Sequence, residues 1–119
     1  MKLNLFKLKK RQPVEVDHER VVLSETRLSA ANINEVNRKY AEKFRGKSCV
    51  VVVCQELRFI DSSGLGFLVG MRNSMLAPKQ VILEGIEDPT LVELLSLTRL
   101  DQVFQLSKSL KESQRLKQG

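Results

Sequence analysis

The feature that most constrains the fold is a run of four valines, Val50–Val53, with a cysteine on either side at Cys49 and Cys54. A continuous apolar run of this length, rich in β-branched residues, is typical of a strand covered on both faces. Strands of this kind lie at the centre of sheets that have helices packed on both sides. The run therefore predicts an α/β domain built around one central strand.

Helix and strand patterns alternate on either side of this run. Apolar residues at helical spacing predict a helix over residues 30–44 and a second helix that ends near Leu76. A third helix begins at Asp88-Pro89, with an N-cap residue and a proline at the first helical position. Short strands are expected at residues 80–83 and 103–106.

An opening hairpin completes the predicted fold. Residues 13–24 alternate as two strands do, with a turn at Asp17–Glu19. Strands that alternate with helices after such a hairpin imply a largely parallel set of strands. We therefore expect an α/β fold of one domain, a mixed sheet with an opening hairpin and helices packed on it.

The positive charge is concentrated at the two ends of the chain. The 119 residues include 20 Lys and Arg against 14 Asp and Glu, a formal charge of +6. Residues 1–11 carry +5 and residues 107–119 carry +3, so the remainder carries −2. We divide the chain into a basic extension (1–12), a domain (13–106) and a basic C-terminal helix or tail. With five Phe, one Tyr and no Trp, the chain lacks aromatic platforms for bases, and no nucleic-acid partner is expected.

Cysteine and histidine content excludes further classes. Cys49 and Cys54 point to opposite faces if the run is a strand, so they cannot pair, and free buried thiols indicate a cytoplasmic protein. His18 is the single histidine, and no CxxC or HExxH pattern is present, so neither a metal site nor a Ser-His-Asp hydrolase is expected. No stretch approaches the ~20 apolar residues of a membrane span, so no stable membrane insertion is expected.

The chemistry is concentrated in residues 58–70. This segment places Ser62 and Ser63 at a helix N-terminus, just beyond the C-terminal end of a buried strand. Open α/β sheets expose functional groups at this position. Backbone N–H groups and the helix dipole favour an anion there, so a phosphate on such a serine would be tolerated.

Small residues line one face of the same helix. These residues, Ser62, Gly66, Gly70 and Ser74, are spaced by four and form a smooth stripe on which another protein can settle. Phe67 falls outside the densest apolar arc, so we expect it to be partly exposed, as a partner anchor would be. The residues expected to bind a partner are Asp61, Ser62, Ser63, Gly64, Gly66, Phe67, Gly70 and Ser74.

Two simpler interpretations stay open on the local pattern alone. Asp61 and the serines can serve only as helix caps, with Gly64 in a tight turn. Gly64, Gly66 and Gly70 also form G-x-G-x-x-x-G, one residue longer than the dinucleotide fingerprint, in a chain short for a nucleotide-dependent enzyme. No catalytic residue and no cofactor is expected.

A family resemblance adds to this picture. Residues 59–66, Phe-Ile-Asp-Ser-Ser-Gly-Leu-Gly, resemble the motif of STAS domains, specifically of bacterial anti-sigma factor antagonists. The likeness extends over about residues 14–106 and includes the late segment at residues 97–104. In that family the serine directly after the aspartate is phosphorylated by a partner kinase, which implies Ser62, with Ser63 the less favoured acceptor.

The resemblance implies a non-enzymatic partner-switching regulator. Unphosphorylated, it would bind a serine kinase that is also an anti-sigma factor, and a serine phosphatase would reset it. The alternative is a non-phosphorylated STAS subunit that binds the ATPase of a lipid-transporting ABC complex. In such transport subunits the corresponding motif usually resembles Asp-Thr-Ala-Gly, so Ser62 and Ser63 favour the signalling role.

The chain departs from the family pattern at three places away from the acceptor. Arg27–Ser29 lacks the usual glycine and acid after the second strand. Ala77–Lys79 and Arg99 stand where glycines are common. Ser29 leaves open any contact that a partner makes through the acidic position.

Overall fold

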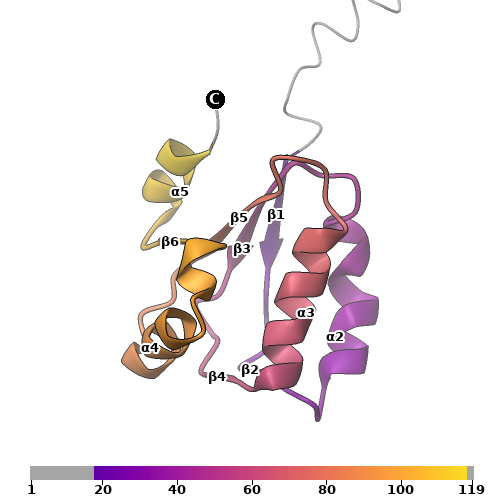
Figure 1. Ribbon diagram of the computed structural model, residues 1–119, viewed down its shortest axis with the longest axis vertical. Coiled ribbons are helices and arrows are strands. Elements are labelled where there is room, and N and C mark those ends of the chain that lie inside the picture. The colour runs from indigo at the N-terminus through magenta and orange to yellow at the C-terminus, as the bar shows by residue number, and fades with distance from the viewer. Residues whose placement is uncertain (1–17, 118–119) are drawn as a thin grey trace, which may run out of the picture.

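The computed structural model describes residues 18–117 (Figure 1). In chain order the elements are β1 (His18–Val22), β2 (Arg27–Leu28), α2 (Ile33–Tyr40), the 3-10 helix η2 (Ala41–Lys43), β3 (Cys49–Val53), β4 (Phe59–Ile60), α3 (Ser62–Asn73), β5 (Gln80–Glu84), α4 (Pro89–Leu97), the 3-10 helix η3 (Leu100–Gln102), β6 (Gln105–Ser107) and α5 (Leu110–Leu116).

The valine run forms the centre of the main sheet. The four strands lie in the order β1-β3-β5-β6, and each neighbouring pair is parallel. All five residues of β3 are buried. A second, two-stranded sheet pairs β2 with β4, also in parallel. The predicted α/β fold and central strand are confirmed.

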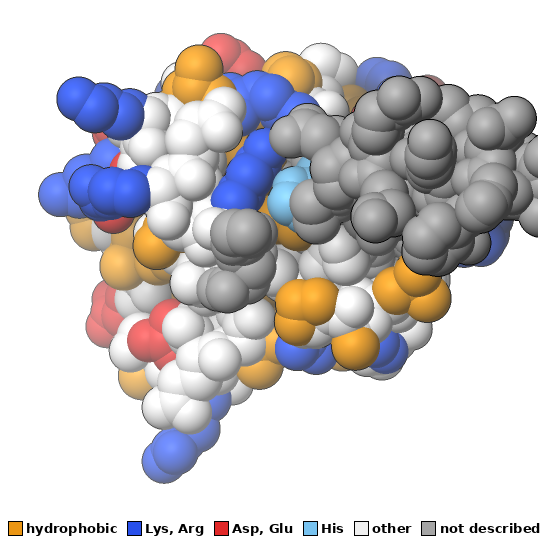
Figure 2. All heavy atoms as spheres, turned by 90° about the horizontal axis from the view of Figure 1, so that it is seen from above, with side chains coloured by type: hydrophobic (Ala, Val, Ile, Leu, Met, Phe, Trp, Pro, Cys, Tyr) orange, Lys and Arg blue, Asp and Glu red, His pale blue; other side chains and the backbone are white. Residues whose placement is uncertain are grey.

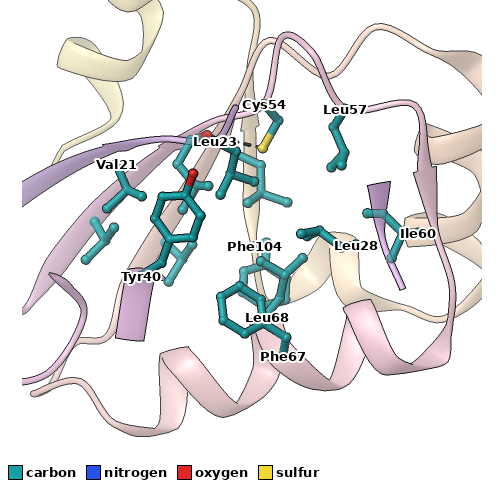
Figure 3. Packing of buried hydrophobic residues seen from close by; sticks show 14 of the residues in the cluster. Val21, Leu23, Leu28, Tyr40, Cys54, Leu57, Ile60, Phe67, Leu68 and Phe104 are labelled. Atoms are coloured by element: carbon teal, nitrogen blue, oxygen red, sulfur yellow. Dashed lines mark hydrogen bonds between the residues drawn. The ribbon is translucent and has the colours of Figure 1, made fainter. Parts of the chain in front are cut away.

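Alternate residues of β3 face two different apolar clusters. Val50 and Val52 belong to the larger cluster, to which α2, α3 and α4 all contribute (Figures 1 and 3). Cys49, Val51 and Val53 belong to the smaller cluster on the other face, against which Leu116 of α5 packs. The period-two pattern of a strand therefore separates the two faces, each with a helix residue packed on it.

The two cysteines lie in different clusters, as their spacing predicted. Cys49 is part of the smaller cluster and Cys54 of the larger one, and both thiols are free. Desolvation by burial raises the pKa of Cys54 to about 12, with a smaller contribution from the nearby Glu84. Cys54 is therefore an unreactive thiol at neutral pH.

The opening hairpin is corrected at its turn. His18 and Glu19, predicted as part of a turn, are the first residues of β1, which pairs in parallel with β3. The predicted first arm lies outside the described residues, and every strand pair within residues 18–117 is parallel. Charged residues are tolerated in this strand because each has a partner of opposite charge. Glu19 lies 3.7 Å from Lys47, and Arg20 forms an ion pair with Glu84.

The other boundaries shift by a few residues. The helix predicted over residues 30–44 is α2, which continues into η2. The strands expected at 80–83 and 103–106 are β5 and β6, and the basic C-terminal segment contains α5. The two-residue strands β2 and β4 were not predicted.

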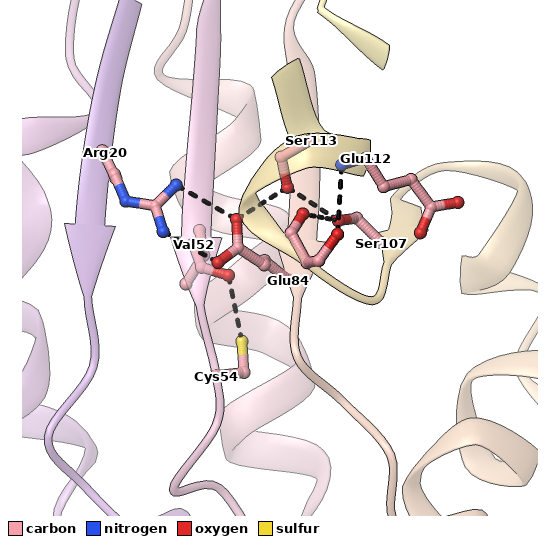
Figure 4. Close-up of polar contacts among 8 residues, drawn as sticks. Arg20, Val52, Cys54, Glu84, Ser107, Glu112 and Ser113 are labelled. Atoms are coloured by element: carbon pink, nitrogen blue, oxygen red, sulfur yellow. Dashed lines mark hydrogen bonds and ion pairs between the residues drawn. The ribbon is translucent and has the colours of Figure 1, made fainter. Parts of the chain in front are cut away.

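A buried carboxylate holds α5 on the sheet. Glu84, at the end of β5, is 2% exposed and accepts two hydrogen bonds from Arg20, at 3.0 and 2.8 Å (Figure 4). The Ser113 hydroxyl of α5 donates a third, at 2.7 Å, and lies 2.7 Å from the Ser107 hydroxyl. Desolvation by burial alone raises the pKa of Glu84, but the hydrogen bonds from Arg20 and Ser113 outweigh it, so the net pKa is lowered.

Replacing Glu84 tests this network. We expect Glu84→Gln to lower the free energy of unfolding by about 2 kcal/mol at neutral pH, because Arg20 and Ser113 lose a charged acceptor. Since the folded-state pKa is lowered, the contribution is complete above the usual glutamate pKa and is lost as the pH falls through the folded value. The gap between wild type and variant, measured by urea unfolding, should therefore narrow below about pH 4.

Glu42→Gln is the matched control, because Glu42 pairs with Arg45 on the exposed surface. It should change the free energy of unfolding by less than about 0.5 kcal/mol. Equal effects of the two substitutions, or a Glu84 effect that does not depend on pH, would contradict the assignment.

Candidate functional site

Asp61 joins the start of α3 to a turn 31 residues earlier in the chain. Its Oδ1 atom accepts hydrogen bonds from the backbone N–H groups of Ser63 at 2.8 Å and Gly64 at 3.1 Å. Its Oδ2 atom accepts a third bond, from the N–H of Ala30 at 3.0 Å. The pKa of Asp61 is lowered, and the bond from Ala30 is the largest cause. Asp61 is thus an N-cap, as predicted, and also a cross-link between two segments.

Gly64 lets the first turn of α3 approach β2 closely. A Cβ atom at this position would lie 2.3 Å from the Leu28 carbonyl oxygen and 2.8 Å from the Cγ2 atom of Ile60. These distances are too short for any side chain without movement of the backbone. Gly64 is buried, so its part in the site is to position the helix rather than to touch a partner.

Three small residues form an open strip on the surface of α3. Ser62, Gly66 and Gly70 are exposed, and apart from adjacent residues and the backbone of α3 itself, no atom lies within 4 Å of a Cβ placed on either glycine. Ser74, the fourth member of the predicted stripe, is half-buried, and its hydroxyl donates to the Met71 carbonyl at 2.7 Å. The open strip Ser62–Gly66–Gly70 begins at the candidate acceptor serine.

The two serines differ in accessibility. Ser62 is exposed, whereas Ser63 is half-buried and its backbone N–H is bonded to Asp61. A kinase active site must surround the acceptor hydroxyl, so the geometry favours Ser62 over Ser63.

Phe67 is not an exposed anchor. Its side chain is 6% exposed and lies within the larger cluster (Figure 3). It meets Phe44 edge to face, with the ring centroids 6.3 Å apart. The expectation of partial exposure is wrong because α3 buries two sides, one toward the sheet and one toward the end of η2. The apolar periodicity of α3 alone does not show that the segment after η2 also packs against this helix.

Phe59 is an aromatic side chain near the site that the sequence reasoning missed. It is 45% exposed, three residues before Ser62, and the Arg27 guanidinium lies 5.1 Å from its ring centroid. On the short strand β4, Ile60 points into the core and Phe59 points out. The alternation of the two apolar residues before Asp61 is the signal that identifies the exposed one.

The glycines do not form a phosphate-binding loop. Gly64, Gly66 and Gly70 all lie within α3, and only Gly64 is near its N-terminus. A dinucleotide-binding loop needs its glycines at the turn that precedes the helix. Among residues 18–117, no group of three His, Cys, Asp or Glu side chains is placed to hold a metal ion. No helix in this part of the chain is long and apolar enough to cross a membrane.

Comparison with known families identifies the domain. The STAS domain model matches residues 11–113, most of the chain. The chain belongs to the STAS domain family. The STAS fold is also found in a crystal structure of a candidate anti-sigma factor antagonist from Thermotoga maritima, with a TM-score of 0.65. The two share 21% sequence identity, and the match covers 81% of this chain and 85% of the other. A search of curated proteins found no match.

Two glycine substitutions test how this STAS domain positions α3. Gly64→Ala should lower the free energy of unfolding by about 3 kcal/mol, because its methyl group collides with the Leu28 backbone. Gly66→Ala should raise it by up to about 1 kcal/mol, because alanine favours helix and the position is open. Urea unfolding of both variants gives the comparison. A Gly64→Ala protein as stable as wild type would show that α3 does not lie on β2 as described.

Proposed function

We propose that this STAS domain is a partner-switching regulator of the anti-sigma factor antagonist type. Unphosphorylated, it binds a cognate serine kinase that also acts as an anti-sigma factor, and phosphorylation of Ser62 ends the complex. The observation that carries the proposal is that Ser62 is exposed at the head of the open strip on α3. Membership of the STAS family and the described role of the Thermotoga maritima neighbour support it.

The surface around Ser62 suits close contact with another protein. The open strip has no side chain larger than a hydroxymethyl group, so a partner backbone or helix can approach α3 directly. Phe59, three residues before Ser62, offers an exposed aromatic anchor, and the Arg27 guanidinium already packs on its ring. Flat contact with one exposed aromatic residue is a common arrangement at protein interfaces.

Phosphorylation changes this surface by charge. The added group carries about −1.5 to −2 charges at neutral pH. The N–H groups of Ser63 and Gly64, which otherwise favour an anion, already donate to Asp61. Phosphate on Ser62 therefore lies beside an anionic carboxylate with two nearby donors occupied. Covering this dianion with a partner costs its hydration, so the complex dissociates while the fold stays intact.

The domain is a substrate in this reaction and supplies no catalytic group. The kinase transfers the γ-phosphoryl group of ATP to the Ser62 oxygen, with ADP as the leaving group, and a phosphatase returns the serine by hydrolysis. Asp61 is a poor general base, because its pKa is lowered and both its oxygens accept backbone hydrogen bonds. Two free, buried cysteines support a cytoplasmic setting for the exchange.

Substitution of Ser62 tests the proposal. With a serine kinase encoded near this gene, Ser62→Ala should keep kinase binding and lose phosphorylation, and Ser62→Asp should weaken binding about tenfold or more. Phosphopeptide mapping and a pull-down measure the two properties. Ser63→Ala is the matched control and should be phosphorylated like wild type. Phosphorylation of Ser62→Ala at the wild-type level would overturn the site assignment.

A bulky residue on the open strip tests the docking surface separately. Gly66→Gln should fold but bind the kinase at least about tenfold more weakly, because a long side chain then covers the strip. Ser96→Gln makes a similar change on the exposed surface of α4 and should bind normally. Capture of an ABC transporter ATPase in place of a kinase would contradict the switching function.

A further inference from the structure

A second candidate site lies at the other end of α3. A pocket of about 540 Å³ opens where β5 and β6 begin, ten residues along the helix from Ser62, or about 15 Å of helix length. Its lining includes Arg72, Lys79, Gln102 and Gln105. Figure 2 looks onto this end of the sheet, and Lys and Arg side chains are prominent on the face that it shows.

The described residues supply no counter-charge to this pocket. Arg72 is half-buried, and its Nε atom is buried without a hydrogen-bond partner. Within residues 18–117, no carboxylate pairs with Arg72, and none lines the pocket. A partly desolvated guanidinium is costly unless an anion balances it. The arrangement therefore favours an anionic ligand.

Lys79 adds a second positive charge on the same pocket. Its ammonium group donates one hydrogen bond to the Asn73 carbonyl, at 3.3 Å, which leaves further N–H donors on the same nitrogen. Its backbone has a φ of +56°, a left-handed conformation that is uncommon outside glycine and asparagine. The pocket thus brings together one cation from α3 and one from the turn before β5, and none of its described lining residues is acidic.

The remaining lining indicates the size and class of the ligand. The Gln102 amide can donate and accept hydrogen bonds, and the Gln105 amide keeps its NH₂ donors, because its oxygen accepts from Gln80 at 2.6 Å. Val81 and Val103 offer an apolar surface. A volume of this order is typical of small-molecule sites. The planar guanidinium group binds a carboxylate or a phosphate through two parallel hydrogen bonds. We propose that this pocket binds a small molecule through a carboxylate or phosphate group held by Arg72 and Lys79.

Binding of two simple probes tests the proposal. Succinate presents carboxylates and glycerol 3-phosphate presents a phosphate, each on a short carbon skeleton, and sodium chloride keeps the ionic strength constant. Titration of the full chain, followed by amide chemical shifts, should show saturable binding of at least one probe below about 10 mM. The largest shifts are expected at Arg72, Gln80 and Gln105. The probe that binds identifies the favoured anion.

Charge-removing variants locate the site. Arg72→Gln should weaken binding at least about tenfold. Lys79→Asn should also weaken binding, because it removes the second positive charge. Asparagine tolerates the left-handed backbone conformation at this position, so this variant still tests the site if the Arg72 variant folds poorly. Arg38→Gln removes an exposed charge from α2 and is the matched control. Ser62→Ala should bind the probes like wild type, so the result is independent of the switching function.

Two outcomes would overturn the proposal. One is the absence of saturable binding of either probe by the wild-type chain. The other is equal affinity for the probe in Arg72→Gln, Lys79→Asn and the control variant Arg38→Gln.

Discussion

The site depends on one carboxylate that accepts three backbone hydrogen bonds. Asp61 accepts hydrogen bonds from N–H groups in the first turn of α3 and from the N–H of Ala30, and these two segments are far apart in the sequence. The lowered pKa keeps the carboxylate charged, so this contribution is present above the usual aspartate pKa and lost as the pH falls through the folded value. Gly64 makes the same junction possible sterically, because no side chain fits against Leu28. Together the two residues determine where α3 begins and which side of it faces solvent.

The same junction separates the contacts that stabilise the fold from the surface that we propose binds a partner. The amides of Ser63 and Gly64 already donate to Asp61, so they are not free to bind a phosphate on Ser62. Such a phosphate would therefore change the binding of a partner rather than the folding of the domain. The exposed glycines of α3 contribute nothing to the core, so a partner can use them without competing with packing. The Glu84 network lies on the face of the sheet that α5 covers, and the Arg72 pocket lies at the other end of α3. Each can therefore be altered without changing Ser62, the proposed acceptor, so the three features can be separated by experiment.

Local patterns predicted the parts of this fold that depend on local energetics. The valine run, the Asp88-Pro89 helix start and the Asp61 cap each have a short-range physical cause, and each occurs in the structure. The errors come from long-range partners. His18 and Glu19 resemble a turn by composition, yet they form strand, where Glu19 lies near Lys47 and the next residue pairs with Glu84. The STAS-like motif placed Ser62 correctly on an exposed helix start, but Phe67, Phe59 and Arg72 depend on neighbours far away in sequence.

The role of Asp61 is tested most directly by following its titration in the intact domain. Amide chemical shifts of Ala30, Ser63 and Gly64 should change together as the pH is lowered, with one shared midpoint below the usual aspartate pKa. That result would show one carboxylate holding both segments. Separate midpoints for Ala30 and the two α3 amides, or a shared midpoint at or above the usual aspartate value, would contradict the account.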